Sequence, residues 1–213
     1  MKFDIVGLDK SEKDIFDEVM NNNQMSLSGR EAIYSYFGDG KKYLEWGSGG
    51  SALWYVNEII KNKVDTQIIS VEHHTDWYNK VKSAVNNHLA PTDEQFLYLH
   101  KEASYASIAF TTPDGNIPFN VISTPFEEVT AGLTEYINPP EIDLSDIDVF
   151  LVDGLARGAC LATIKILVKK DAVVFLHDID GRESWYQWAL DLWEKDYSIE
   201  YVYHNLIKLV PND

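Results

Sequence analysis

Strand-like and helix-like segments alternate along most of this 213-residue chain. Short apolar or β-branched segments of strand character occur at residues 41–46, 66–72, 95–101, 146–154 and 171–178. Helical spacing of apolar residues follows four of these segments, which predicts an α/β domain with a mainly parallel sheet and helices on both faces. The end, SIEYVYHNLIKLVP, predicts an antiparallel hairpin that turns near His204 and Asn205 and brings the sheet to seven strands.

Two regions lie outside this alternation. Residues 1–40 are predicted to form an N-terminal helical extension, with a break near residues 21–24, and residues 41–213 the main domain. Residues 103–145 contain five of the seven prolines and are expected to form a long, lid-like insertion, part of it helical over about residues 126–136. Insertions of this length in compact domains are usually functional or mobile.

The chain is strongly acidic, which limits its partners. Acidic residues outnumber basic ones by 34 to 18, and the formal net charge is −16. Nucleic acids and anionic lipid surfaces should be repelled by such a chain. The single cysteine, Cys160, excludes an internal disulfide and a Cys-rich zinc site. Neither a membrane span nor a signal peptide is visible. We therefore expect a soluble, cytoplasmic protein with no nucleic-acid partner and no membrane insertion.

A glycine-rich loop follows the first predicted strand and begins a helix. Gly47 and Gly49 would let a ligand approach the backbone, and the free N–H groups of the helix start would attract a carboxylate or phosphate. The next predicted strand ends at Glu72, where an acid can accept hydrogen bonds from both hydroxyls of a ribose. Together these features predict a ligand that contains a nucleoside.

The residues around the loop favour one nucleoside ligand over others. Glu45, two residues before Gly47, would repel a pyrophosphate but suits a ligand with an α-ammonium group. The loop also lacks the G-x-x-x-x-G-K-[ST] signature of a P-loop. S-adenosylmethionine fits this pattern, because it carries both a ribose and an α-ammonium group.

Four segments carry a family resemblance: YLEWGSGGS, SVEHHTDWY, VFLVDGLARGACL and VVFLHDIDGR. In series they resemble the motifs of class I S-adenosylmethionine-dependent methyltransferases, over about residues 40–210. More narrowly they resemble small methyltransferases of polysaccharide and glycan assembly. The resemblance implies a Rossmann-like fold, S-adenosylmethionine as the methyl donor, and a sugar or other small-molecule hydroxyl as the acceptor.

The resemblance also implies which residues bind the donor. The methionine end would contact the loop, the ribose would contact the end of the second strand, and the adenosine would lie beside the residue that follows. Trp46 lies inside the loop and is expected to take part. The expected donor-binding residues are Glu45, Trp46, Gly47, Ser48, Gly49, Glu72 and His73.

Acidic and basic side chains at two later strand ends are the candidates for catalysis. Asp153 follows the fourth strand, and His177 and Asp178 end the fifth, so the three should converge over the donor. His177 suits the base that removes the proton of the acceptor hydroxyl, because a histidine side chain titrates near neutral pH. Because side chains alternate along a strand, only one of His177 and Asp178 is expected to face the site.

Some methyltransferases of this class bind a divalent cation at the same strand ends. The resemblance therefore suggests that Asp153, Asp178 and Asp180 hold Mg²⁺ or another divalent cation, since hard oxygen ligands suit it. The alternative is that Asp178 and Asp180 cap the following helix.

Three further side chains near these strand ends are candidates for binding the acceptor. Arg157 and Arg182 would bind acceptor oxygens, or else pair with Asp153 and Asp178. Tyr186 would stack on a sugar ring, or else belong to the core.

Two other functions stay open from the sequence. The acceptor could be a small phenolic metabolite, and a catechol would require the metal. Alternatively, the chain could be a non-catalytic nucleotide-binding module. The N-terminal helices could cover the acceptor site or form a homodimer contact.

Overall fold

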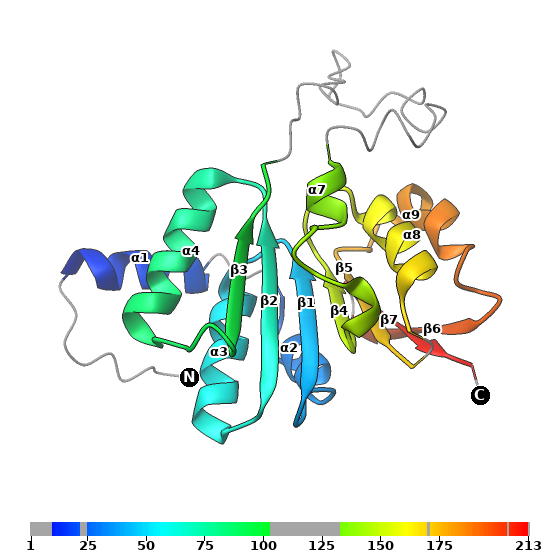
Figure 1. Ribbon diagram of the computed structural model, residues 1–213. Helices are drawn as coiled ribbons and strands as arrows, with labels where there is room; N and C mark the ends of the chain where they lie inside the picture. The colour runs from blue at the N-terminus through cyan, green and yellow to red at the C-terminus, as the bar shows by residue number, and fades with distance from the viewer. Residues whose placement is uncertain (1–9, 22–24, 103–132, 170, 204, 213) are drawn as a thin grey trace, which may run out of the picture.

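The computed structural model of the protein describes residues 10–21, 25–102, 133–169, 171–203 and 205–212 (Figure 1). Most of the expected insertion at residues 103–145, residues 126–132 of the helix expected over residues 126–136 and one residue of the expected hairpin turn lie outside these ranges. The strands are β1 (Lys41–Trp46), β2 (Thr66–Glu72), β3 (Phe96–His100), β4 (Val149–Val152), β5 (Val173–His177), β6 (Tyr197–Tyr203) and β7 (Leu206–Pro211). The helices are α1 (Lys10–Asn21), α2 (Leu27–Tyr34), α3 (Gly50–Asn62), α4 (Thr75–His88), α7 (Thr134–Ile137), α8 (Arg157–Leu167) and α9 (Glu183–Leu190), with a 3₁₀ turn η2 (Leu144–Asp146).

The described strands form one seven-stranded sheet in the order β3-β2-β1-β4-β5-β7-β6. The five strands from β3 to β5 are parallel, and β7 pairs antiparallel with both β5 and β6. This arrangement confirms the predicted Rossmann-like α/β fold with a C-terminal hairpin. The strand order reverses between β1 and β4, which is the place where open α/β sheets bind ligands.

Both faces of the sheet are covered because the central strands are apolar throughout. In β4, Val149 and Leu151 face the layer of α1 to α4, whereas Phe150 and Val152 face α8 and α9. All four side chains are at most 2% exposed. Strands buried on both faces have this composition, so β4 and β5 fix the centre of the domain.

The N-terminal helices belong to the same packed layer as α3 and α4. Phe16, Val19, Met25 and Ile33 are buried and join one core cluster with α3. Helix α1 packs on α3 and α4, and α2 packs on α3 and β6 (Figure 1). Ser26 caps α2 by accepting a hydrogen bond from the Gly29 N–H at 3.1 Å.

Within the described part of the chain, no helix combines the length and the apolar character needed to span a membrane.

Candidate active site

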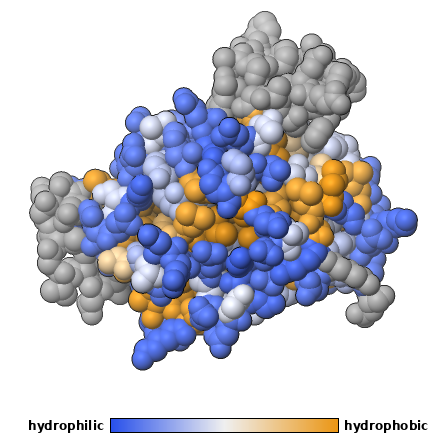
Figure 2. Space-filling view, viewed as in Figure 1, coloured by the Kyte–Doolittle hydropathy of each residue, from blue (hydrophilic) through white to orange (hydrophobic). Residues whose placement is uncertain are grey.

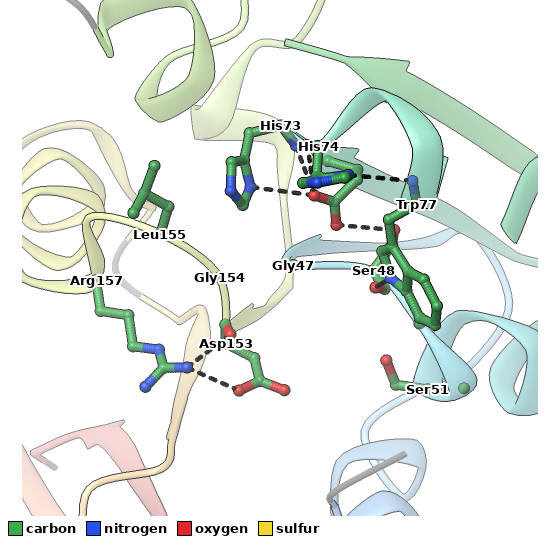
Figure 3. A pocket seen from close by; sticks show the side chains of 13 residues that line it. Gly47, Ser48, Ser51, His73, His74, Trp77, Asp153, Gly154, Leu155 and Arg157 are labelled. Carbon is green, nitrogen blue, oxygen red and sulfur yellow. Dashed lines mark hydrogen bonds and ion pairs between the residues drawn. The ribbon is translucent and has the colours of Figure 1, made fainter. Parts of the chain in front are cut away.

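The carboxyl ends of β1, β2 and β4 open onto a pocket of about 630 Å³ (Figure 3). It lies at the point where the strand order reverses, as expected for this type of sheet. The pocket contains residues of all three motif segments that follow these strands. It is lined by Gly47, Ser48, Gly49, Gly50, Ser51, Glu72, His73, His74, Trp77, Asp153, Gly154, Leu155 and Arg157.

Two glycines allow the ends of β1 and β4 to touch at the floor of the pocket. Gly47 has a φ of +87°, and a Cβ there would lie 2.5 Å from the Gly154 Cα. A Cβ on Gly154 would in turn collide with the Tyr136 hydroxyl and lie 2.7 Å from the Gly47 nitrogen. The sequence suggested that Gly47 is small to admit a ligand. The structure adds a packing reason, which is the close approach of the two backbones.

The glycine-rich loop presents the start of helix α3 to the pocket. Gly49 is the N-cap residue and supplies no side-chain cap, and the first N–H groups of a helix have no partner within the helix. The Trp77 indole holds the loop from above, because its Nε1–H donates to the Ser48 carbonyl at 2.7 Å. The Ser48 hydroxyl is hydrogen-bonded to Tyr98 and also donates to Glu72 Oε2 at 3.4 Å. A carboxylate at this helix start would meet a positive field.

Glu72 is held in a fixed, ionised state at the end of β2. Its Oε1 accepts the backbone N–H groups of His73 and His74, both at 2.8 Å. Burial by itself would raise the pKa of Glu72, but the hydrogen bonds from His73 and His74 outweigh it and hold the pKa below its ordinary value. The His73 ring also lies 3.0 Å from Oε1 through its Nδ1. The result is a carboxylate that faces the pocket and can accept hydroxyl groups.

Glu45 and Trp46 do not line the pocket, although both were expected to bind the donor. The Glu45 side chain is fully buried under α3 and accepts the hydroxyls of Tyr43, Ser51 and Ser70 at 3.0, 3.1 and 2.6 Å. Burial raises its pKa to about 7 despite these hydrogen bonds. In this geometry, Glu45 therefore does not reach the pocket to contact the α-ammonium group of the donor.

The Trp46 side chain points to the opposite face of the sheet and belongs to the core. Its ring stacks on Phe150, and its Nε1–H donates to the Tyr136 carbonyl at 2.8 Å. The residue is fully buried. The reason is the alternation of β1: Glu45 and Trp46 are neighbours in a strand with both faces covered, so neither side chain points past the strand end.

Asp153 and His177 form a hydrogen-bonded pair at the ends of β4 and β5. The His177 Nδ1 lies 2.9 Å from Asp153 Oδ1, and because the carboxylate only accepts, Nδ1 carries the proton. His177 is 4% exposed and lies behind Asp153, which itself lines the pocket. Figure 3 shows the other carboxylate oxygen of Asp153 pointing away from Arg157. Asp153 therefore faces the pocket, and His177 orients it from behind.

Two arginines connect this pair to Asp178. The Arg157 Nη2 donates to the Asp153 carbonyl at 2.8 Å and lies 3.4 Å from Asp153 Oδ1, while its Nη1 lies 3.3 Å from Asp178 Oδ2. Arg182 donates to the same Asp178 oxygen. Nη1 of Arg157 also lies 3.3 Å from the Tyr186 hydroxyl. The alternative in which both arginines pair with the two acids is the arrangement present here.

Neither His177 nor Asp178 lines the pocket, although one of the two was expected to face the site. Both side chains belong to the same hydrogen-bonded cluster, His177 through Asp153 and Asp178 through Arg157. The physical reason is that β5 ends at His177, and Asp178 has a left-handed φ of +66°. Strand alternation no longer applies at that residue.

The three aspartates expected to bind a cation do not form a site for one. No group of three or more His, Cys, Asp or Glu side chains within the described residues could hold a metal ion. The Arg157 guanidinium lies between Asp153 and Asp178, where the cation would have to bind. Asp180 is exposed on the loop, and its backbone N–H bonds to Asn205. Neither Asp178 nor Asp180 caps α9, whose N-cap residue is Arg182.

Several pocket residues were not predicted to be functional. His74, Trp77 and Leu155 line the pocket. Tyr136 supports the pocket from below: its hydroxyl accepts the Leu155 N–H at 3.0 Å, and its ring lies 5.6 Å from the His73 ring. His74 and Trp77 lie in the motif segment SVEHHTDWY, so their position next to Glu72 was the available signal. No local pattern marks Tyr136.

Comparisons with known proteins give a likeness of structure alone. No protein-family model and no curated protein sequence matches the chain. A methyltransferase-like protein from Silicibacter pomeroyi superimposes with a TM-score of 0.57 at 16% identity, over 89% of this chain and 88% of that one.

Two further structures cover nearly the whole chain. A precorrin-6y C5,15-methyltransferase from Geobacter metallireducens has a TM-score of 0.53 at 12% identity, over 99% and 98% of the two chains. A Podospora anserina methyltransferase with bound S-adenosylhomocysteine has a TM-score of 0.50 at 12% identity, over 99% and 91%. The chain therefore has the Rossmann-like fold of S-adenosylmethionine-dependent methyltransferases.

Proposed function

We propose that this protein is an S-adenosylmethionine-dependent O-methyltransferase whose acceptor is a sugar hydroxyl of a glycan. The observation that carries the donor assignment is the pocket itself. It brings the start of α3, the glycine-rich loop and the Glu72 carboxylate together at the reversal of the strand order. A Podospora anserina methyltransferase with the same fold binds S-adenosylhomocysteine, the product that the donor leaves behind.

The donor would bind along the carboxyl ends of β1 and β2. Glu72 would accept the two ribose hydroxyls, because its carboxylate is ionised and oriented by the His73 and His74 N–H groups. The carboxylate of the methionine part would lie at the start of α3, where the helix N–H groups attract an anion. His73 would contact the adenosine. The sulfonium methyl group would then point toward β4, which carries Asp153.

Asp153 would act as the general base. Its free carboxylate oxygen would take the proton of the acceptor hydroxyl while the hydroxyl oxygen attacks the methyl carbon of the donor. The carbon–sulfur bond breaks, its electron pair goes to sulfur, and S-adenosylhomocysteine leaves. His177 holds the other oxygen at 2.9 Å and so fixes the direction of the base. Alignment of the reacting atoms would supply much of the remaining acceleration.

The acceptor assignment is supported by charge and by the polar wall of the pocket. The chain has a formal net charge of −16, which disfavours nucleic acids and other polyanions as acceptors. A catechol acceptor would require a divalent cation between its two hydroxyls, and Arg157 lies where that cation would bind. A neutral polyol needs only hydrogen-bonding groups, which the Asp153–Arg157–Asp178 cluster offers. The motif resemblance to glycan methyltransferases points the same way.

The test is transfer of a radiolabelled methyl group from S-adenosylmethionine to a panel of neutral oligosaccharides, with small phenols as the comparison panel. We expect label on an oligosaccharide, and expect Asp153→Asn to lower kcat at least 100-fold, as loss of a general base does. The matched control is Asp171→Asn, because Asp171 is exposed and lies before β5, at the other edge of the sheet. Label on phenols alone, or full activity in Asp153→Asn, would contradict the proposal.

A further inference from the structure

We propose that the Arg157 guanidinium is the built-in cation of the acceptor site, so that this protein binds its hydroxyl acceptor without a divalent metal ion. The inference rests on the proposed function for the identity of the acceptor. Its physical basis is the ion-paired arrangement of Asp153, Arg157, Asp178 and Arg182. This arrangement does not depend on which reaction the protein catalyses.

The first observation is where the guanidinium lies. Arg157 comes from the first residue of α8 and reaches back across the strand ends, so that Nη2 faces Asp153 and Nη1 faces Asp178. Figure 3 shows its side chain directed toward Asp153 at the wall of the pocket. The two carboxylates thus share one positive group between them. In a metal-binding arrangement, the cation would occupy this same position.

The second observation is the balance of charge. Asp153 and Asp178 contribute two negative charges, and Arg157 and Arg182 contribute two positive ones. The side chain of Arg157 is 13% exposed and that of Asp153 is 23% exposed, so bulk water screens them only in part. A divalent cation entering this cluster would meet a fixed guanidinium at close range, and repulsion there would be strong. The cluster is already neutral without a metal ion.

The third observation is a hydrogen-bond donor that has no acceptor. Within the described residues, the Nε–H of Arg157 is buried and meets no hydrogen-bond partner. This nitrogen lies below the surface of the pocket, so a molecule in the pocket does not reach it in this arrangement. Buried donors without a partner are costly in a folded protein. The other two guanidinium nitrogens are held by Asp153, Asp178 and Tyr186, which fixes Arg157 between the two acids.

These observations assign two jobs to one side chain. Arg157 neutralises the two acids, as a divalent cation would, and it holds Asp153 at the wall of the pocket through its hydrogen bond to the Asp153 carbonyl. Arg157 is therefore a positioning residue for Asp153, and it occupies the place that a divalent cation would need between Asp153 and Asp178.

The experiment measures Mn²⁺ binding by electron paramagnetic resonance, on the full chain and without donor or acceptor. Unmodified protein and Arg182→Met should show only weak, surface-type binding. Arg157→Met should gain one Mn²⁺ site at least tenfold tighter, because Asp153 and Asp178 are left without their shared cation. The double variant Arg157→Met/Asp178→Asn should lose that site. Arg182→Met is the matched control, since it removes an arginine from Asp178 and leaves Arg157 in place.

Two results would overturn the inference. One is a single tight Mn²⁺ site on the unmodified chain that Asp178→Asn abolishes. The other is a folded Arg157→Met protein, judged by its circular dichroism, that gains no Mn²⁺ site. If Arg157→Met does not fold, the comparison of the unmodified chain with Asp178→Asn still shows whether the unmodified chain has a tight Mn²⁺ site. None of these measurements uses methyl transfer, so failure of the proposed reaction would remain distinguishable.

Discussion

The buried carboxyl group of Glu45 should make the stability of this protein fall as the pH rises from about 5 to 8. Burial raises the pKa of Glu45 from 4.5 to about 7. Between these two values the folded chain keeps a proton that the unfolded chain has released. Because the folded state then binds more protons, the free energy of unfolding decreases with increasing pH. The penalty is complete above pH 7, where the folded state must also ionise Glu45.

The size of the effect follows from the shift. One pKa unit corresponds to about 1.4 kcal/mol, so the loss between pH 5 and pH 8 is about 2–3 kcal/mol. Other carboxyl groups act in a different range. The pKa values of Glu72 and Asp178 are lowered, so their contribution changes only below their ordinary values near pH 4. The interval above pH 5 is therefore the one in which Glu45 can be seen.

The variant Glu45→Gln should remove this dependence, because an amide does not titrate. Urea denaturation at pH 5, 6, 7 and 8 gives the free energy of unfolding for both proteins. Relative to the unmodified chain, Glu45→Gln should gain about 2–3 kcal/mol between pH 5 and pH 8. Glu94→Gln, at an exposed position before β3, is the control and should leave the pH profile unchanged. Parallel profiles for the unmodified chain and Glu45→Gln would refute the reasoning.

Two further variants test the packing and the loop of the pocket. Gly154→Ala should lower the free energy of unfolding by about 3 kcal/mol, and Tm by roughly 10 °C, because its Cβ would collide with the Tyr136 hydroxyl. Calorimetry should show no comparable loss in Gly38→Ala, because a Cβ there would lie 3.8 Å from its nearest neighbour, the Lys41 Cγ. Trp77→Phe should weaken S-adenosylhomocysteine binding about fivefold in a titration, through loss of its 2.7 Å hydrogen bond to the Ser48 carbonyl. Unchanged affinity would show that the indole does not hold the loop.

The fold was predictable because its signals are local. Apolar segments such as 149–152 and 173–177 can only be strands covered on both faces, and their alternation with helical segments requires parallel connections. The pocket was predictable for the same reason. Glycines and acids at successive strand ends must meet at one edge of a parallel sheet, which is how Gly47, Glu72 and Asp153 come together.

The side-chain directions were not predictable in the same way. A strand with both faces buried shows no polar alternation, so nothing in the sequence says that Glu45 and Trp46 both point away from the pocket. The contact of Arg157 with Asp178 depends on the register that sets Val152 beside Leu176. Register between strands is a tertiary property and leaves no trace in residue spacing.

The contribution of Tyr136 was invisible for a related reason. It is 90 residues from Trp46 in the sequence, yet its carbonyl accepts the Trp46 indole and its hydroxyl accepts the Leu155 N–H. Lys101 and Glu141, which form an ion pair at 2.7 Å, likewise join segments 40 residues apart. Such contacts depend on how the chain returns to β4, which no motif encodes.

The measurement that tests the central claim most directly is calorimetric titration of the protein with S-adenosylhomocysteine. We expect one site with micromolar affinity. Glu72→Gln should weaken it at least tenfold, because hydrogen bonds to a charged carboxylate contribute about 1.5–3 kcal/mol. Glu94→Gln, at the opposite edge of the sheet, should leave it unchanged. Absence of binding to S-adenosylhomocysteine, or equal affinity in Glu72→Gln, would contradict the assignment of this pocket as a methyl-donor site.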